Sequence, residues 1–337
     1  MTTTQRTHIK LRDAGELIAA VPHLLGFRPA NSLVIAAHTG GNRSNVSLCL
    51  RADIPTPDLY WSLAEQLQVP VLRANACGVS VLVVCDGVVD PPLPLPHSAL
   101  VEAVTKVFGA VGVAVYHAFW TPEIAKDASW WCYTNLECNG QLPDPTSSPL
   151  AAASAASGSI TYDSRAEMRA SLEPVDRYPL ALRAERIKAA LLHQPDEARA
   201  TKLVADAIAD VRDGTLTLDD DRIVDLAVAL SHMRVRDGCL KPEVIQLGRP
   251  LEQLWADLTR ALPVPYRAEA ACLLAFTAFL QGDGAKAGVA LDAALEANPE
   301  HWGAQLLRYS MDWGLPPTAV AEAVAHAFHG EQTHAQN

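Results

Sequence analysis

The fold of the first half of this chain is decided by the stretch Val79-Ser80-Val81-Leu82-Val83-Val84-Cys85. Valine dominates this stretch, and its only strongly polar side chain is a serine. A short and nearly continuous β-branched run is typical of a strand that is buried on both faces of a sheet. We therefore expect this strand to lie in the interior of an α/β domain.

Towards the N-terminus, the sequence predicts a hairpin with a helix on either side. Residues 32–37 and 46–51 have strand character, and the glycine- and asparagine-containing segment 38–43 between them suits a tight turn. Apolar residues at helical spacing predict helices over 15–25 and 58–75.

Towards the C-terminus, the same alternation continues. The sequence predicts a helix over 98–108 and strands over 113–120 and 130–133. Strands that alternate with helices are characteristic of α/β folds. We expect residues 1–145 to form an α/β domain with a mixed sheet, in two or three layers.

The second half of the chain is predicted to be all-helical. Residues 146–162 are small and polar with no periodic apolar face, so we expect a linker or long loop there. Residues 163–337 show helical periodicity, and no β-rich run appears among them. The stretch from Ser164 to Glu167 has the pattern of a capping box, which marks a helix start.

Within this all-helical domain, residues of about 265–330 resemble tetratricopeptide helical hairpins. The small residues Ala287 and Ala294, a turn glycine and a helix-ending proline stand as they do in that helix–turn–helix repeat. The large aromatic residue usual near its start is missing. Helices over 302–313 and 318–329 would form a second, more degenerate unit.

Composition and charge exclude several function classes. The chain of 337 residues is 49% apolar and carries a formal net charge of −11. Residues 1–150 hold 9 basic and 12 acidic side chains, and residues 151–337 hold 18 and 26. Neither half presents a basic field, so we expect no binding to nucleic acid or to an anionic membrane surface.

The cysteines and the N-terminus favour a soluble, cytoplasmic protein. The seven cysteines are odd in number and scattered, which argues against a secreted disulfide framework. The polar start of the chain has no apolar signal core, and no run approaches the roughly 18 apolar residues of a membrane span. We expect no disulfide, no bound metal ion and no cofactor.

The loop that leads into the first predicted strand is the strongest candidate site. It carries Arg28, Asn31 and Ser32, and loops held by a rigid sheet are common places for binding. Arg28 could clamp a carboxylate or phosphate, whereas the favoured interpretation is an ion pair with Asp53 that fixes the loop. Arg51 and Asp53 point to the same face of their strand, where a structural ion pair is favoured over a ligand contact.

Other candidate groups have simpler structural interpretations. Cys132 and Cys138 could be a redox pair or half of a metal site, but two cysteines do not complete a zinc shell, so free thiols are favoured. The acidic run from Asp219 to Asp221 suits a helix start, and the glycine-rich segment from Gly282 to Gly288 suits an interhelical turn. His326 and His329 suit surface positions. No catalytic motif is present, so catalytic residues cannot be assigned.

Several motifs resemble one known family. The longest is VPHLLGFRP, from Val21 to Pro29, followed by Ser32-Leu33-Val34. Four shorter stretches fit the same family: Leu50 to Pro55, Trp130 to Cys138, Arg234 to Asp237, and Gly282 to Gly284 with Asn298-Pro299. Over roughly residues 10–325 the chain resembles the actinobacterial family called domain of unknown function 4192. At Cys138-Asn139-Gly140 it departs from the longer, cysteine-richer family pattern. The resemblance supports the architecture and implies no activity.

Two functions are compatible with the sequence. The first is a non-enzymatic interaction or scaffold protein that binds an unidentified protein through its helical domain. The alternative is an enzyme or small-ligand sensor with a pocket at the Arg28–Ser32 loop near Asp53. The segment from Ala270 to Leu280 is apolar almost all round and needs cover on every side. We expect Phe276 and Phe279 to flank its less well covered face and to line a protein-binding groove.

Overall fold

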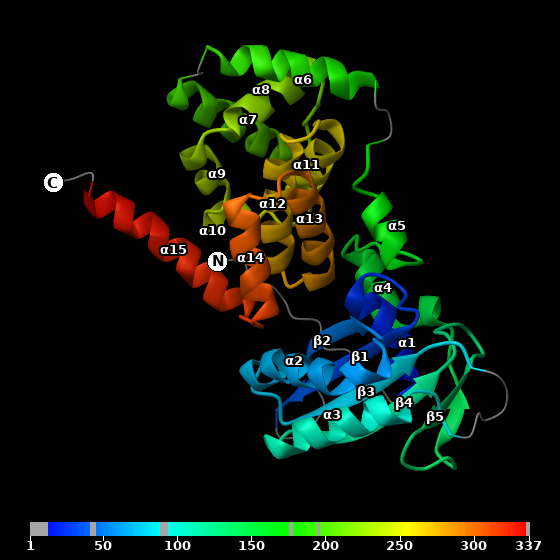
Figure 1. Cartoon of the computed structure of the whole chain (residues 1–337). Helices are drawn as coiled ribbons and strands as arrows, with labels where there is room; N and C mark the ends of the chain where they lie inside the picture. Colours follow the sequence, from blue (N-terminus) through cyan, green and yellow to red (C-terminus); the bar gives the residue numbers. More distant parts are fainter. Residues whose placement is uncertain (1–12, 41–44, 88–93, 175–177, 194–195, 335–337) are drawn as a thin grey trace. The chain divides into compact units, whose positions relative to one another are not determined.

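The protein consists of two compact units, Met1–Glu167 and Met168–Asn337 (Figure 1). The computed structural model describes residues 13–40, 45–87, 94–174, 178–193 and 196–334. The first unit contains a mixed six-stranded sheet, and the second consists of helices. This confirms the predicted class, an α/β domain followed by a helical domain.

The sheet has the strand order β2-β1-β3-β4-β5-β6. Its strands are β1 (Ser32–Thr39), β2 (Asn45–Asp53), β3 (Gly78–Val84), β4 (Ala114–Thr121), β5 (Ser129–Cys132) and β6 (Asn139–Gln141). Only β3 and β4 pair in parallel, and every other neighbouring pair is antiparallel. The predicted hairpin is confirmed as β1 and β2, whereas the short edge strand β6 was not predicted.

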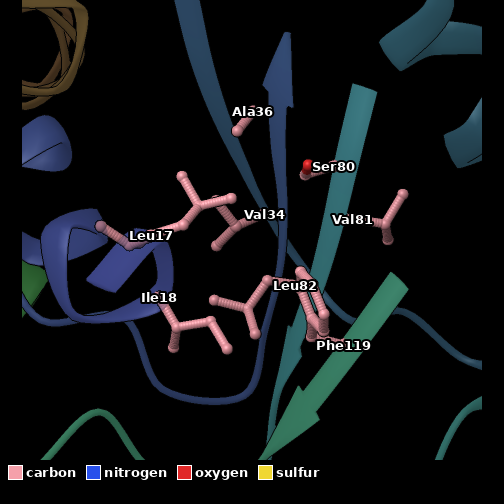
Figure 2. Close-up of a pocket in the computed structure, with 9 residues that line it drawn as sticks. Leu17, Ile18, Val34, Ala36, Ser80, Val81, Leu82 and Phe119 are labelled. Carbon is pink, nitrogen blue, oxygen red and sulfur yellow. The ribbon is translucent and has the colours of Figure 1, made fainter. Parts of the chain in front are cut away.

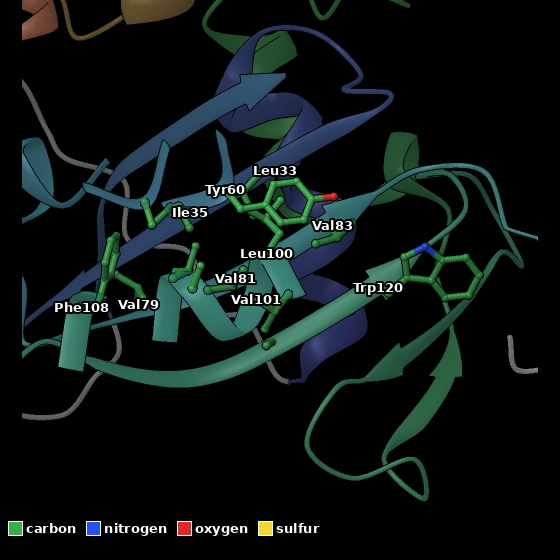
Figure 3. Packing of buried hydrophobic residues seen from close by; sticks show 14 of the residues in the cluster. Leu33, Ile35, Tyr60, Val79, Val81, Val83, Leu100, Val101, Phe108 and Trp120 are labelled. Carbon is green, nitrogen blue, oxygen red and sulfur yellow. The ribbon is translucent and has the colours of Figure 1, made fainter. Parts of the chain in front are cut away.

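Helices cover both faces of this sheet, so the first unit has three layers. On one face, α2 (Tyr60–Arg73) and α3 (Ser98–Ala110) pack over the odd-numbered side chains of β1 and β3 (Figure 3). On the other face, α1 (Ala14–Leu25) packs over the even-numbered ones. All seven residues of β3 are buried, as its apolar run predicts.

Part of the predicted linker is structured. Residues Pro149–Ala156 form helix α4, and the hydroxyl of Ser148 accepts a hydrogen bond from the backbone N–H of Ala151 at 3.0 Å. The segment lacks a periodic apolar stripe, but alanine is the best helix former and serine is a strong N-cap. Beyond it, Tyr162 forms a parallel bridge with Phe27. Residues 149–156 of the expected linker or long loop over 146–162 are therefore helical.

The described part of the second unit is helical. Its described helices after α5 (Arg165–Ala170) are α6 (Tyr178–Leu191), α7 (Glu197–Asp213), α8 (Asp220–Ala229), α9 (Met233–Cys239), α10 (Pro242–Ile245), α11 (Arg249–Ala261), α12 (Arg267–Leu280), α13 (Gly284–Ala297), α14 (Trp302–Asp312) and α15 (Pro317–His334). Helix α12 packs mainly against α11 and α13. The helices expected over 302–313 and 318–329 are present as α14 and α15.

Candidate functional site

Arg51 organises the predicted loop site. Its side chain is only 15% exposed, and it forms an ion pair with Asp53 at 2.6 Å. Its Nε also donates to the Oγ of Ser32 at 2.8 Å. The fully buried Ser32 hydroxyl in turn donates to the carbonyl of Ala30 at 2.6 Å. The expected ion pair of Arg51 and Asp53 is confirmed, and these contacts occupy the cation with the protein's own groups.

Arg28 does not pair with Asp53, so the predicted contact between them is wrong. The guanidinium of Arg28 lies 3.8 Å from Asp163, and its backbone N–H donates to the carbonyl of Tyr162 at 2.9 Å. Asp53 is taken by Arg51, the nearer cation on the same strand face. Asn31 is exposed and has a left-handed φ of 46°, which asparagine tolerates better than most residues.

The loop therefore leaves one cation with spare hydrogen-bonding capacity. The Arg28 side chain is 42% exposed, and its distance of 3.8 Å to the Asp163 carboxylate is long for an ion pair. Its Nε is buried and has no hydrogen-bond partner among the described residues. Such an N–H group can donate a hydrogen bond to an anionic oxygen.

A small apolar pocket of the first unit lies instead between α1 and the sheet. It is lined by Leu17, Ile18, Val21, Val34, Ala36, Ser80, Val81, Leu82 and Phe119 (Figure 2). None of the predicted site residues contributes to this lining. Ser80 supplies its only polar side chain, so the pocket is suited to apolar groups.

Ser80 forms a buried pair with His38. The Nε2 of His38 lies 2.8 Å from the Oγ of Ser80, and both residues are buried. Burial, together with the nearby His117, lowers the pKa of His38 below its ordinary value of 6.5. A serine and a neutral histidine can act as nucleophile and base. However, the His38 Nδ1 has no partner among the described residues, so no third group orients the imidazole as a catalytic triad would require.

Only a weak signal for this pair is present in the sequence. His38 and Ser80 are 42 positions apart and meet because β1 and β3 are neighbours in the sheet. Ser80 stands out as a polar residue inside an apolar run, and that was the only available hint. We interpret the pair as a structural polar contact within the core, in which the hydrogen bond between His38 and Ser80 satisfies one ring nitrogen of the histidine.

The seven cysteines are free thiols. Cys132 is buried at the end of β5, whereas Cys138 is exposed. In the described part of the chain, no group of three or more histidine, cysteine, aspartate or glutamate side chains is placed to hold a metal ion.

The acidic and glycine-rich motifs of the helical unit have the structural roles that the sequence indicated. Asp219 caps α8, since its carboxylate accepts from the backbone N–H of Arg222 at 2.8 Å. Gly282 lies in the turn between α12 and α13, and Asp283 caps α13. The side chains of His326 and His329 lie outside the described residues.

Phe276 and Phe279 do not line an exposed groove. Each residue is only 7% exposed. Helix α12 is packed by α11 and α13, with further contacts from α9, α14 and α15. The apolar circumference of α12 is thus covered within the unit itself, which corrects the expectation of a poorly covered face at these rings.

An exposed apolar stripe does exist, on α14. Trp302, Leu306, Tyr309 and Trp313 are 74%, 45%, 58% and 49% exposed. Their spacing of four, three and four positions places them on one helical face. The opposite face, which includes Leu307, is buried against the unit. The same spacing is readable in the sequence, but there it is indistinguishable from the stripe of a core-facing helix.

The fold and these surfaces define a two-unit protein with an α/β unit followed by a helical unit. A sequence model of the family described as "Domain of unknown function (DUF4192)" matches residues 15–318, and the chain belongs to this family. No curated protein and no solved structure gives a significant match. Among the described helices, none has the length and hydropathy needed to cross a membrane.

Proposed function

We propose that this member of the DUF4192 family is a non-enzymatic interaction protein that docks a helix of another protein on α14. The stripe of Trp302, Leu306, Tyr309 and Trp313 carries the proposal. Contiguous exposed apolar patches mark interaction sites, and tryptophan and tyrosine are the residues most enriched at binding hot spots. The tetratricopeptide-like succession of α12 to α15 supports the same function.

The stripe fits a helical partner with basic flanks. Apolar residues at alternating spacings of four and three form the seam along which two helices pack. Exposed acidic residues stand near both ends of the stripe, at Glu300 and Asp312. The excess of acidic over basic residues in 151–337 extends this negative field. A basic amphipathic helix complements both features.

The test compares two double variants of the full chain. Trp302→Ser with Tyr309→Ser removes the two most exposed aromatic rings of the stripe. Leu182→Ser with Leu192→Ser removes exposed apolar side chains of the same unit away from α14. Partners are identified by in-cell crosslinking of the native chain, and a peptide of the crosslinked helix is then titrated against each variant.

We expect the stripe variant to weaken peptide binding by at least about tenfold, since hot-spot residues contribute about 2 kcal/mol or more. The control variant should bind like the native chain. Equal binding by the stripe variant, or crosslinks that avoid α14, would contradict the proposal. The cells used for crosslinking also serve to check the expected cytoplasmic location. The expected actinobacterial source is a separate prediction about the organism that carries the chain.

A small-ligand sensor is the second candidate, because Arg28 keeps a buried Nε without a partner among the described residues. A thermal-shift screen of carboxylates and phosphates tests it. A stabilising compound whose effect disappears in Arg28→Ala would favour this function over the first. No shift with any anion would leave Arg28 as a structural residue of the loop.

A further inference from the structure

Cys132 and Cys138 face each other across the end of the β5–β6 hairpin. The antiparallel register pairs Trp130 with Gly140 and Trp131 with Asn139. Continued by one position, it sets Cys132 opposite Cys138. The backbone N–H of Cys132 donates to the carbonyl of Cys138 at 3.0 Å, which confirms that the two residues are directly paired.

This pairing brings the thiols within bonding reach. Directly opposed residues of antiparallel strands have Cα atoms about 4.5–5.5 Å apart. A disulfide requires a Cα separation of about 4.4–6.8 Å, so the two cysteines can form one without a large backbone movement. The hairpin loop between them is itself fixed, since the backbone N–H of Cys138 donates to the carbonyl of Asn135 at 3.0 Å.

The environment of Cys132 stabilises its thiolate. Burial acts to raise the pKa of this thiol, but hydrogen bonds outweigh burial and hold the pKa below its ordinary value. They come from the hydroxyl of Thr134, 3.1 Å from the sulfur, and from nearby backbone groups that include those of Thr134 and Asn135. A thiolate held by hydrogen-bond donors is the nucleophile of thiol–disulfide exchange.

The environment of Cys138 is different. Burial of its thiol, followed by the charge of the neighbouring Cys132 sulfur, raises the pKa of Cys138. The residue is nevertheless exposed, whereas Cys132 is 4% exposed. A reagent from solution therefore reaches Cys138 first, and the buried Cys132 is placed to react second.

We propose that Cys132 and Cys138 form a dithiol site that reduces small-molecule disulfides. Cys138, as its thiolate, attacks one sulfur of the small disulfide, which forms a mixed disulfide and releases one thiolate. The Cys132 thiolate then attacks the Cys138 sulfur, which forms the Cys132–Cys138 disulfide and releases the second thiolate. The two cysteines lose two protons and two electrons, and the small disulfide takes them up as two thiols.

The experiment uses the full chain with Cys77→Ser, because Cys77 is the other exposed cysteine. This chain is incubated with oxidised glutathione and analysed by intact mass and peptide mapping. We expect it to lose two hydrogens, to retain no glutathione, and to yield one crosslinked peptide that joins Cys132 to Cys138.

Two further variants separate the steps. Addition of Cys132→Ser should leave one glutathione trapped on Cys138, whereas Cys138→Ser should prevent both glutathione uptake and disulfide formation at this hairpin. Retention of glutathione on Cys138 in the Cys77→Ser chain would overturn the proposal, as would equally fast oxidation of the Cys138→Ser variant. If Cys132→Ser fails to fold, the connectivity in the Cys77→Ser chain decides, since pairing of Cys138 with any other cysteine contradicts the site.

Discussion

At the scale of single residues, two arginines that look equivalent in the sequence have unequal roles. Arg51 is largely buried and bonds to Ser32 and Asp53, whereas the ion-pair partner of Arg28 among the described residues is the exposed Asp163. Removal of a charged hydrogen-bond partner from a buried group costs about 1.5–3 kcal/mol, but a surface ion pair contributes only about 0–1 kcal/mol.

The first prediction follows from this difference. Arg51→Ala should lower the free energy of unfolding by about 1.5–3 kcal/mol, and Arg28→Ala by less than about 1 kcal/mol. Urea denaturation measures both. In double-mutant cycles, Arg51→Ala should couple to Ser32→Ala, whereas Arg28→Ala and Asp53→Ala should add. Strong coupling of Arg28 with Asp53 would contradict the described ion pairs.

The second prediction concerns pH and His38. Burial lowers the pKa of His38 in the folded state below 6.5, so below this pH the unfolded state takes up a proton that the folded state resists. The chain should lose stability as pH falls below about 6.5, and above it both states are neutral and the effect vanishes. In thermal unfolding, His38→Gln should reduce the loss of stability with falling pH. Part of the loss should remain because burial also lowers the pKa of His97. An unchanged pH profile would argue against the buried site.

At the scale of elements, α12 and α14 present apolar residues to different surroundings. The third prediction compares them. Phe276→Ser with Phe279→Ser should cost several kcal/mol, because truncation of a single buried phenylalanine costs about 3–5 kcal/mol. Trp302→Ser with Tyr309→Ser should cost less than about 1 kcal/mol, since both rings are mostly exposed. Chemical denaturation of the two double variants measures this difference in the free energy of unfolding. Equal losses would show that the stripe on α14 is covered in solution.

Elements with strong periodicity or composition could be predicted from the sequence. The β-branched run of β3, the hairpin of β1 and β2, and the helices α14 and α15 lie within two residues of their expected ranges, apart from the longer end of α15. The short strand β6 was missed because three residues with a central glycine carry little strand signal. Helix α4 was missed because an alanine-rich segment has no amphipathic stripe even when it is helical.

The candidate site was predicted less well, because side-chain partners depend on the sheet. The sequence placed Arg51 and Asp53 together, since residues two apart on a strand share a face. It could not supply the contact of Arg51 with Ser32, which arises from the pairing of β1 with β2, or the contact of Arg28 with Asp163. It also could not show that neighbouring helices already cover Phe276.

At the scale of the whole molecule, the fourth prediction concerns the unit boundary. Limited proteolysis should release fragments close to residues 1–167 and 168–337, because the two units have separate cores. Residues 146–162 should resist cleavage, since α4 and the bridge of Phe27 with Tyr162 hold them in the first unit. Mass spectrometry of the early fragments locates the cuts, and a dominant cut inside α4 would contradict the prediction.

The position of β3 has a consequence for how the first unit opens. Its backbone is bonded to β1 on one side and to β4 on the other, and its residues are buried on both faces. An amide proton there can exchange with solvent deuterium only when the whole unit comes apart. The exchange rate of the Val81 and Val83 amides should therefore report the global opening free energy of this unit. Segments such as the Asn31 loop should exchange through smaller, local fluctuations.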